Sequence, residues 1–225
     1  MPGAVTARTS LFVSAPLPGD AAARLAEVCD VTIGEPGSGV AGRLFAANAA
    51  RFDAVLTMVT DRVDAALLAS APRLRLVANM AVGVDNIDLA ACQERGIVVT
   101  NTPGTLTDAT ADLAFGLILA AARRIAEGDR MVRAGEFHGW RPSMLVGQRV
   151  HGAELGIVGM GRIGQAVARR ARGFGMRVLY TQRTQLLPEL ERALGARYLP
   201  VDALFESVDI LTLHCPLTEA TRGIV

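Results

Sequence analysis

Short runs of apolar residues alternate, through the first part of the chain, with stretches in which apolar side chains recur at helical spacing. The runs are apolar throughout, as expected of strands that are buried on both faces. Because strands and helices alternate, the pattern is typical of α/β folds in which helices cover a parallel sheet. The predicted strands lie at residues 11–13, 31–33, 54–59 and 74–78, and the predicted helices at 21–28, 41–50 and 63–68.

A second series of the same kind lies further along the chain. Its predicted strands are residues 155–158, 177–180, 197–199 and 209–213. We therefore predict an α/β protein with two Rossmann-like or flavodoxin-like parallel-sheet lobes, over residues 1–104 and 105–225. The Rossmann sheet continues beyond a fourth strand, so the second lobe is expected to be incomplete at its C-terminus.

Residues 107–124 are an almost uninterrupted run of good helix formers, and a second helical stretch extends to about residue 134. The long helix is expected to lead into the second lobe. Its apolar faces are too wide for a helix with one side in solvent, so it is either an ordinary core helix or part of a subunit interface. Residues 135–151, which include Trp140, are predicted to form a long irregular connection.

The composition is that of a soluble globular chain, with 51% hydrophobic and 20% charged residues. The 23 basic side chains are balanced by 22 acidic ones, which gives no electrostatic reason to bind nucleic acid. All of the basic residues are arginine. A P-loop, a Schiff-base lysine and a lysine general base are therefore excluded.

Cysteine usage and hydropathy bear on the compartment. Cys29, Cys92 and Cys215 are isolated from one another, which suggests neither a metal site nor a disulfide framework. The longest apolar run, residues 113–122, is too short to span a bilayer, and no export signal is apparent. We expect a cytoplasmic protein without a membrane partner.

The strongest local motif is G-x-G-x-x-G, formed by Gly159, Gly161 and Gly164. It follows an apolar strand directly and opens a helix, which is the context of a dinucleotide-binding turn. There the first glycine permits the tight turn, the second lets the backbone approach a pyrophosphate, and the third lets helix and strand pack closely. The helix N-terminus supplies N–H groups and a positive dipole end.

The end of the next predicted strand bears on the choice of cofactor. An NAD site usually places a carboxylate there to bind the ribose 2′-hydroxyl, whereas this chain has Gln182, Arg183 and Thr184, with no acid before Glu189. These side chains can hydrogen-bond a 2′-phosphate, and the guanidinium adds a charge-assisted contact. NADP(H) is therefore favoured over NAD(H), although Arg183 could also be a surface residue with no part in the choice.

With these residues in view, the chain resembles the D-isomer-specific 2-hydroxyacid dehydrogenases, and most closely their glyoxylate/hydroxypyruvate reductase branch. The resemblance extends over essentially the whole length and implies NADPH-dependent reduction of a small 2-oxo acid to a D-2-hydroxy acid by hydride transfer. It also implies a homodimer built on the long helix and the Trp140 segment. The motifs that carry it lie at residues 77–88, 96–112, 135–140, 159–164 and 213–218.

The resemblance also implies residue roles, with the first lobe binding substrate and the second the cofactor. The loop of Ala81, Val82 and Gly83 would offer backbone N–H groups to the substrate carboxylate. Asp85 and Asn86 would brace this loop, although the simpler role for Asp85 is that of a turn or helix-capping acid before Ile87. The positions that match cofactor contacts are Thr110 on the long helix, Gly159, Met160, Gly161, Arg162, Ile163 and Gly164 at the pyrophosphate, Gln182, Arg183 and Thr184 at the 2′-phosphate, and His214, Cys215 and Pro216 along the ribose.

The catalytic groups implied by the resemblance are an Arg, a Glu and a His, all beyond the region that matches residues 213–218. No such trio occupies matching positions within the chain, which stops at Val225. We therefore assign no catalytic residue and expect a C-terminally truncated member of the family. The alternative is a non-catalytic dinucleotide-binding fragment or interaction module.

Overall fold

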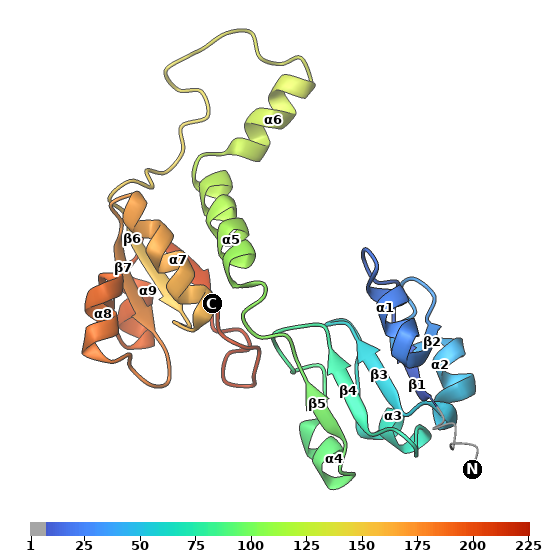
Figure 1. Ribbon diagram of the computed structural model, residues 1–225. Coiled ribbons are helices and arrows are strands. Elements are labelled where there is room, and N and C mark those ends of the chain that lie inside the picture. The colour runs from blue at the N-terminus through green and yellow to red at the C-terminus, as the bar shows by residue number, and fades with distance from the viewer. Residues whose placement is uncertain (1–7) are drawn as a thin grey trace, which may run out of the picture. The chain divides into compact units, whose positions relative to one another are not determined.

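The computed structural model describes residues 8–225, and the chain divides into two compact units, Met1–Pro103 and Gly104–Val225 (Figure 1). Each unit contains one sheet in which all neighbouring strands are parallel. The predicted α/β class with two parallel sheets is confirmed. None of the helices within residues 8–225 combines the length and the apolarity that a bilayer crossing requires.

The first unit has strand order β2-β1-β3-β4-β5, the flavodoxin-like order. Its strands are β1 (Thr9–Val13), β2 (Cys29–Ile33), β3 (Ala54–Thr57), β4 (Leu76–Asn79) and β5 (Val98–Thr100). Its helices are α1 (Ala21–Val28), α2 (Arg43–Asn48), α3 (Ala65–Ser70) and α4 (Leu89–Glu94), with single 3-10 turns at Gly39–Ala41 and Ala49–Arg51.

An aromatic cluster forms the centre of the first unit's core. The rings of Phe45 and Phe52 lie 5.0 Å and 5.2 Å from that of Phe12 on β1. Leu11 and Val13, on either side of Phe12 in β1, are also buried, so the strand is apolar on both faces. This double burial is why β1 appears in the sequence as a continuous apolar run rather than an alternating one.

Two elements of the first unit, α4 and β5, were not predicted from the apolar pattern. β5 has only three residues, lies at the edge of the sheet, and leaves Val98 59% exposed, so it lacks the signature of a buried strand. α4 is set by a local signal instead, because the carboxylate of Asp88 accepts a hydrogen bond from the Ala91 N–H at 3.0 Å. Such a cap satisfies one of the free N–H groups of the first turn.

The second unit has strand order β8-β7-β6-β9, and the four predicted strands are confirmed. Numbered within the unit, this order is 3-2-1-4, as in the corresponding part of the Rossmann sheet. The strands are β6 (Glu154–Val158), β7 (Arg177–Thr181), β8 (Ala196–Tyr198) and β9 (Ile210–Leu213). The helices are α5 (Thr107–Ala122), α6 (Ile125–Arg133), α7 (Arg162–Gly173), α8 (Pro188–Leu194) and α9 (Val201–Ser207).

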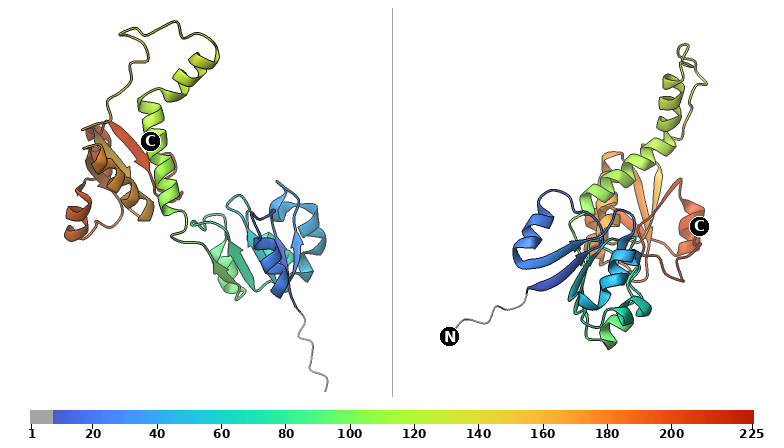
Figure 2. Two further views of the ribbon diagram at one scale, coloured as in Figure 1. Left: turned by 45° about the horizontal axis from the view of Figure 1, so that its top comes forward. Right: turned by 90° about the vertical axis from the view of Figure 1, so that its right-hand side faces the viewer.

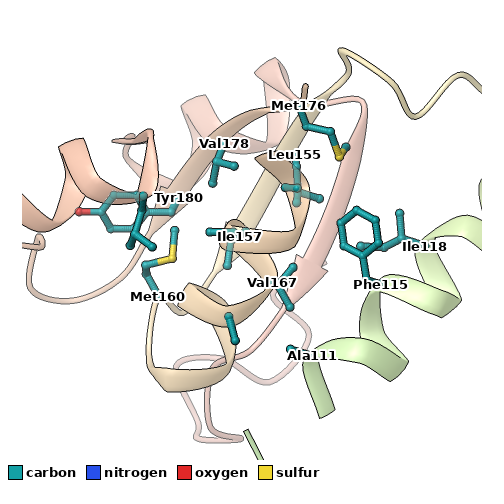
Figure 3. Close-up of a cluster of buried hydrophobic side chains, with 14 of the residues drawn as sticks. Ala111, Phe115, Ile118, Leu155, Ile157, Met160, Val167, Met176, Val178 and Tyr180 are labelled. Atoms are coloured by element: carbon teal, nitrogen blue, oxygen red, sulfur yellow. The ribbon is translucent and has the colours of Figure 1, made fainter. Parts of the chain in front are cut away.

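The long helix α5 packs on α7 along one face only. Ala111, Phe115 and Ile118 point into the core of the unit (Figure 3), whereas Leu113 and Leu117 are well exposed. A left-handed residue between α5 and α6 redirects the chain. In Figure 1 and in both views of Figure 2, α6 and the connection after it extend beyond the sheet of this unit.

Candidate functional site

The turn between β6 and α7 requires glycine at two of its three motif positions. Gly159 has a φ of +94°, and a Cβ there would lie 2.7 Å from the Cys215 nitrogen and from the His214 carbonyl. A Cβ on Gly164 would lie 2.2 Å from the Gly159 oxygen. The first glycine therefore gives the left-handed turn and a close approach to the loop after β9, and the third lets α7 pack on the turn.

The second glycine of the motif is not constrained by the protein. Gly161 precedes the first residue of α7, and no protein atom lies within 4 Å of the position that its Cβ would take. The open space lies at the N-terminus of a twelve-residue helix, where free N–H groups and the helix dipole favour an anion. This geometry fits a dinucleotide pyrophosphate.

The three non-glycine residues of the motif, Met160, Arg162 and Ile163, differ in how far their side chains are exposed to solvent. The Met160 side chain is buried near Ile157 and Tyr180 (Figure 3), so it is a core residue. Arg162 is exposed at the start of α7, and Ile163 packs partly against the core. Of these three side chains, only the Arg162 guanidinium is in a position to meet a polar ligand.

Gln182, directly after β7, ties the glycine turn to the loop between β7 and α8. Its Oε1 accepts a hydrogen bond from the Met160 N–H at 3.1 Å, and its Nε2 donates to the Thr184 carbonyl at 2.5 Å. Arg183 and Thr184 are exposed, and Arg183 takes part in no ion pair within residues 8–225. The Arg183 guanidinium is therefore available to an anion.

Tyr180 fixes the other end of the same loop. Its hydroxyl donates to the Glu191 carboxylate at 2.7 Å and accepts from the Leu186 N–H at 2.8 Å. Burial, reinforced by the hydrogen bond to Glu191, raises the pKa of Tyr180 to about 12. The phenol consequently remains a hydrogen-bond donor, and the loop that carries Arg183 is held in place at both ends.

The loop after β9 lies beside the glycine turn. The His214 N–H donates to the Val158 carbonyl at 2.7 Å, and the His214 ring lies 3.0 Å from the Thr212 hydroxyl. Burial lowers the pKa of His214, which keeps the imidazole neutral near pH 7. His214 therefore brings no cationic charge to this loop.

A cleft of about 760 Å³ brings most of the predicted cofactor residues together, and Thr110 is not among its lining residues. Thr110 instead lines a groove of about 870 Å³ between α5 and β9, which His214 also borders. No group of three or more His, Cys, Asp or Glu side chains within residues 8–225 is arranged to hold a metal ion. The predicted residues that line the first cleft are Gly159, Gly161, Gln182, Arg183, Thr184, His214, Cys215 and Pro216.

The predicted substrate loop follows β4, and all three of its backbone carbonyls accept hydrogen bonds from the protein. Ala81 O accepts from the Thr102 N–H at 2.9 Å, Val82 O from Asn101 Nδ2 at 2.8 Å, and Gly83 O from Asn79 Nδ2 at 2.9 Å. No hydrogen bond from the N–H groups of Val82 and Gly83 is formed to any acceptor within the described part of the chain. The loop can therefore offer N–H donors to an anion.

Two asparagines of this loop region were missed by sequence reasoning. Asn79 ends β4 and Asn101 follows β5, so their place at the carboxyl edge of a parallel sheet was the available signal. Asn86, expected to brace the loop, donates to the carbonyls of Met58 and Asp61. Asp85 is exposed, and its Oδ1 fills the space beside Gly83 where a Cβ would lie 2.8 Å away.

Comparison with known proteins identifies the family. Residues 115–225 match the family model described as the NAD-binding domain of D-isomer-specific 2-hydroxyacid dehydrogenases. A crystal structure of a Thermus thermophilus protein superposes with a TM-score of 0.83 at 41% identity, over 95% of this chain and 67% of that one. The chain belongs to the D-isomer-specific 2-hydroxyacid dehydrogenase family. The resemblance seen in the sequence motifs is thus confirmed.

Relatives within this dehydrogenase family include proteins named glyoxylate reductase. That of Thermococcus litoralis is 53% identical over 177 residues, which is 77% of this chain and 53% of the relative. A glyoxylate reductase structure from Paecilomyces thermophila superposes with a TM-score of 0.81 at 33% identity, over 100% of this chain and 69% of that one. The chain spans about half the length of the first of these relatives.

Membership defines the general chemistry. The family consists of oxidoreductases that act on CH–OH donors, and its NAD-binding domain indicates a nicotinamide dinucleotide as cofactor. The described residues fit that cofactor, because the open space at Gly161 and the cleft beside it lie where a pyrophosphate and a ribose are expected.

Proposed function

We propose that this chain serves the reduction of glyoxylate or hydroxypyruvate to the D-2-hydroxy acid, with NADPH as the preferred hydride donor. The observation that carries the proposal is the cleft at the glycine turn, which has Arg183 on its rim and no carboxylate directly after β7. When bound, the nicotinamide supplies the hydride. The choice of glyoxylate rests on the relatives that carry this name.

The cofactor side of the proposal assigns the 2′-phosphate to the loop after β7. Arg183 would give a charge-assisted contact, and Thr184 a hydroxyl donor. The N-terminus of α7 beside Gly161 would hold the pyrophosphate, with the Arg162 guanidinium close to it in sequence. The loop of His214, Cys215 and Pro216 would lie along the ribose, and Thr110 would approach the cofactor from α5.

The substrate side of the proposal assigns the carboxylate to the loop of Ala81, Val82 and Gly83. Its N–H groups can bind an anion without a lysine, and this chain contains none. We further propose that the protein works in a reducing compartment such as the cytoplasm, where its three free cysteines would stay reduced.

Cofactor titration and turnover test this function. NADPH should quench the fluorescence of this chain with a midpoint at low micromolar concentration, which is on the order of the affinities common for enzyme sites. The protein should oxidise NADPH when glyoxylate is added. Binding without oxidation by any 2-oxo acid would instead support the non-catalytic dinucleotide-binding module, and absence of binding would refute the proposed cofactor site.

We also propose a homodimer that uses α5, α6 and the Trp140 segment. Trp140 is 78% exposed, and Phe137 and Val132, in the same stretch of the chain, are more than half exposed; exposed large apolar side chains can mark an interface. Sedimentation should give twice the chain mass of 23.7 kDa. Trp140→Arg should shift the protein to the monomer, whereas Val28→Arg, at an apolar position on α1 that is 68% exposed, should not. A monomeric wild type would contradict the proposal.

A further inference from the structure

A network of polar side chains lies under the predicted substrate loop, where β3 and β4 end. Thr57, Asp61 and Asn79 are buried, and Asn86 is half-buried. Buried polar groups destabilise a fold unless they are hydrogen-bonded. Each of these four side chains has partners within the network or on neighbouring backbone, so the network is fully connected and should be rigid.

Asn79 is the centre of the network. Its Oδ1 accepts from the Thr57 hydroxyl at 3.0 Å, and its Nδ2 donates to the Gly83 carbonyl at 2.9 Å and to Asn86 Oδ1 at 3.2 Å. Both N–H bonds of the amide are therefore used, and the Gly83 carbonyl, which can only accept, fixes which end of the amide carries them. The side chain has one orientation that satisfies all of these partners.

The network also reaches two other loops at the same end of the sheet. Asn86 Nδ2 donates to the Asp61 carbonyl at 2.8 Å, and the Asp61 carboxylate accepts from the N–H groups of Met58 at 2.7 Å and Val40 at 3.0 Å. The substrate loop is thus connected through side chains to the turns that precede α2 and α3. Its position does not depend on its own short backbone alone.

The planarity of the peptide bond makes these contacts relevant to anion binding. In a trans peptide the C=O of one residue and the N–H of the next point in opposite directions. The carbonyls of Ala81, Val82 and Gly83 are held by Thr102, Asn101 and Asn79, respectively. The N–H groups of Val82, Gly83 and Val84 are consequently each directed away from the anchor of the carbonyl in the same peptide group.

We propose that Asn79 and Asn101 are positioning residues for recognition of the substrate carboxylate. They do not touch the substrate; they hold the loop carbonyls so that consecutive N–H groups are oriented toward a small 2-oxo carboxylate before it arrives. Such preorganisation raises affinity because the loop is not ordered again on binding. The inference rests on the proposed function, since it takes the carboxylate to bind at these N–H groups.

A titration of the isotope-labelled 225-residue chain with oxalate, a planar dicarboxylate analogue of a 2-oxo acid, tests this role. In the wild type, the amide resonances of Val82, Gly83 and Val84 should shift saturably with oxalate. Asn101→Ala should weaken oxalate binding about fivefold and Asn79→Ala about tenfold or more, because each frees one carbonyl of the loop. NADPH affinity should be unchanged in both variants, since the glycine turn lies in the other unit.

The controls separate positioning from general loss of structure. Asn48→Ala removes a hydrogen bond of the same kind, from Asn48 Nδ2 to the Leu44 carbonyl at 3.0 Å, together with one that Asn48 Oδ1 accepts from Arg51 at 3.3 Å, and should leave oxalate binding unchanged. Asn101→Gln keeps an amide donor and should recover part of the affinity. Because the Asn101 bond is exposed, the Asn101 variants keep the test valid even if Asn79→Ala fails to fold.

The outcomes distinguish this inference from the function on which it rests. If the wild type shows no oxalate-dependent shift in the three amides, the proposed carboxylate site is refuted and the positioning role with it. If the wild type responds and the Asn101→Ala variant binds oxalate as tightly, the positioning role alone is overturned. An equal loss of oxalate affinity in Asn48→Ala would also overturn the positioning role, because the effect would then come from general destabilisation.

Discussion

Replacing Gly161 by alanine is expected to weaken NADPH binding by about 100-fold, which corresponds to about 3 kcal/mol, while leaving the stability of the chain unchanged. No protein atom lies within 4 Å of the added methyl group, and the φ of Gly161 is an ordinary −74°. The folded protein therefore has no reason to reject the alanine. The methyl group would, however, occupy the space in which the pyrophosphate is proposed to lie against the backbone.

Gly164→Ala is the matched control for this prediction, because it changes another glycine of the same motif. Its methyl group would lie 2.2 Å from the Gly159 oxygen, so α7 must shift and the chain should lose about 2 kcal/mol of stability. Thermal unfolding and NADPH fluorescence titration measure the two effects separately. The assignment of the pyrophosphate would be wrong if Gly161→Ala bound NADPH like the wild type, or lost as much stability as Gly164→Ala.

The different effects expected at Gly161 and Gly164 show how much of the site the glycine motif predicts from sequence. The spacing of Gly159, Gly161 and Gly164 was enough to predict the turn after a strand and before a helix. The structure adds the reason at each position: a left-handed φ at the first, open space at the second, and contact between backbones at the third. The motif predicts that the second glycine faces the pyrophosphate, and the open space at Gly161 is what such a role requires.

The strands were predictable to the extent that they are buried. β6 and β7 are apolar on both faces, and their continuous apolar runs allowed both strands to be predicted. β5 could not be found in this way, because it has three residues and an exposed Val98. The expected strand at residues 54–59 ends earlier, at Thr57, because the N–H of the next residue, Met58, donates to the Asp61 carboxylate at 2.7 Å rather than to a neighbouring strand.

The parts of the site that depend on side chains reaching another backbone were not predictable. Asn101 binds the Val82 carbonyl, and Gln182 binds the Met160 N–H. Each bond joins segments about twenty residues apart in the sequence, and it forms only because two parallel strands are in a particular register. Local pattern carries no information about that register, whereas the short-range caps at Asp64 and Asp88 are visible in it.

The cofactor preference should reverse when the loop after β7 is changed from cationic to anionic character. Arg183→Ala should weaken NADPH binding about tenfold and leave NADH binding unchanged, because only the 2′-phosphate of NADPH meets the exposed guanidinium. The double variant, with Gln182→Glu in addition to Arg183→Ala, should bind NADPH more weakly still and NADH more tightly than the wild type. The overall change in preference should be about 100-fold. The glutamate can still accept the hydrogen bond from the Met160 N–H, so the glycine turn should keep its shape.

Parallel titrations of each variant with NADPH and NADH measure this change in preference. Arg197→Ala is the matched control, since Arg197 is an exposed arginine on β8 of the same unit and does not line the cleft. It should bind both cofactors like the wild type. A wild type that binds NADH more tightly than NADPH would refute the proposed preference. An unchanged NADPH affinity in Arg183→Ala would instead leave the preference to other residues of the cleft. Salt screens the attraction between Arg183 and the 2′-phosphate in the wild type, and the repulsion between the new carboxylate and this phosphate in the double variant. Added salt should therefore weaken NADPH binding less in the double variant than in the wild type.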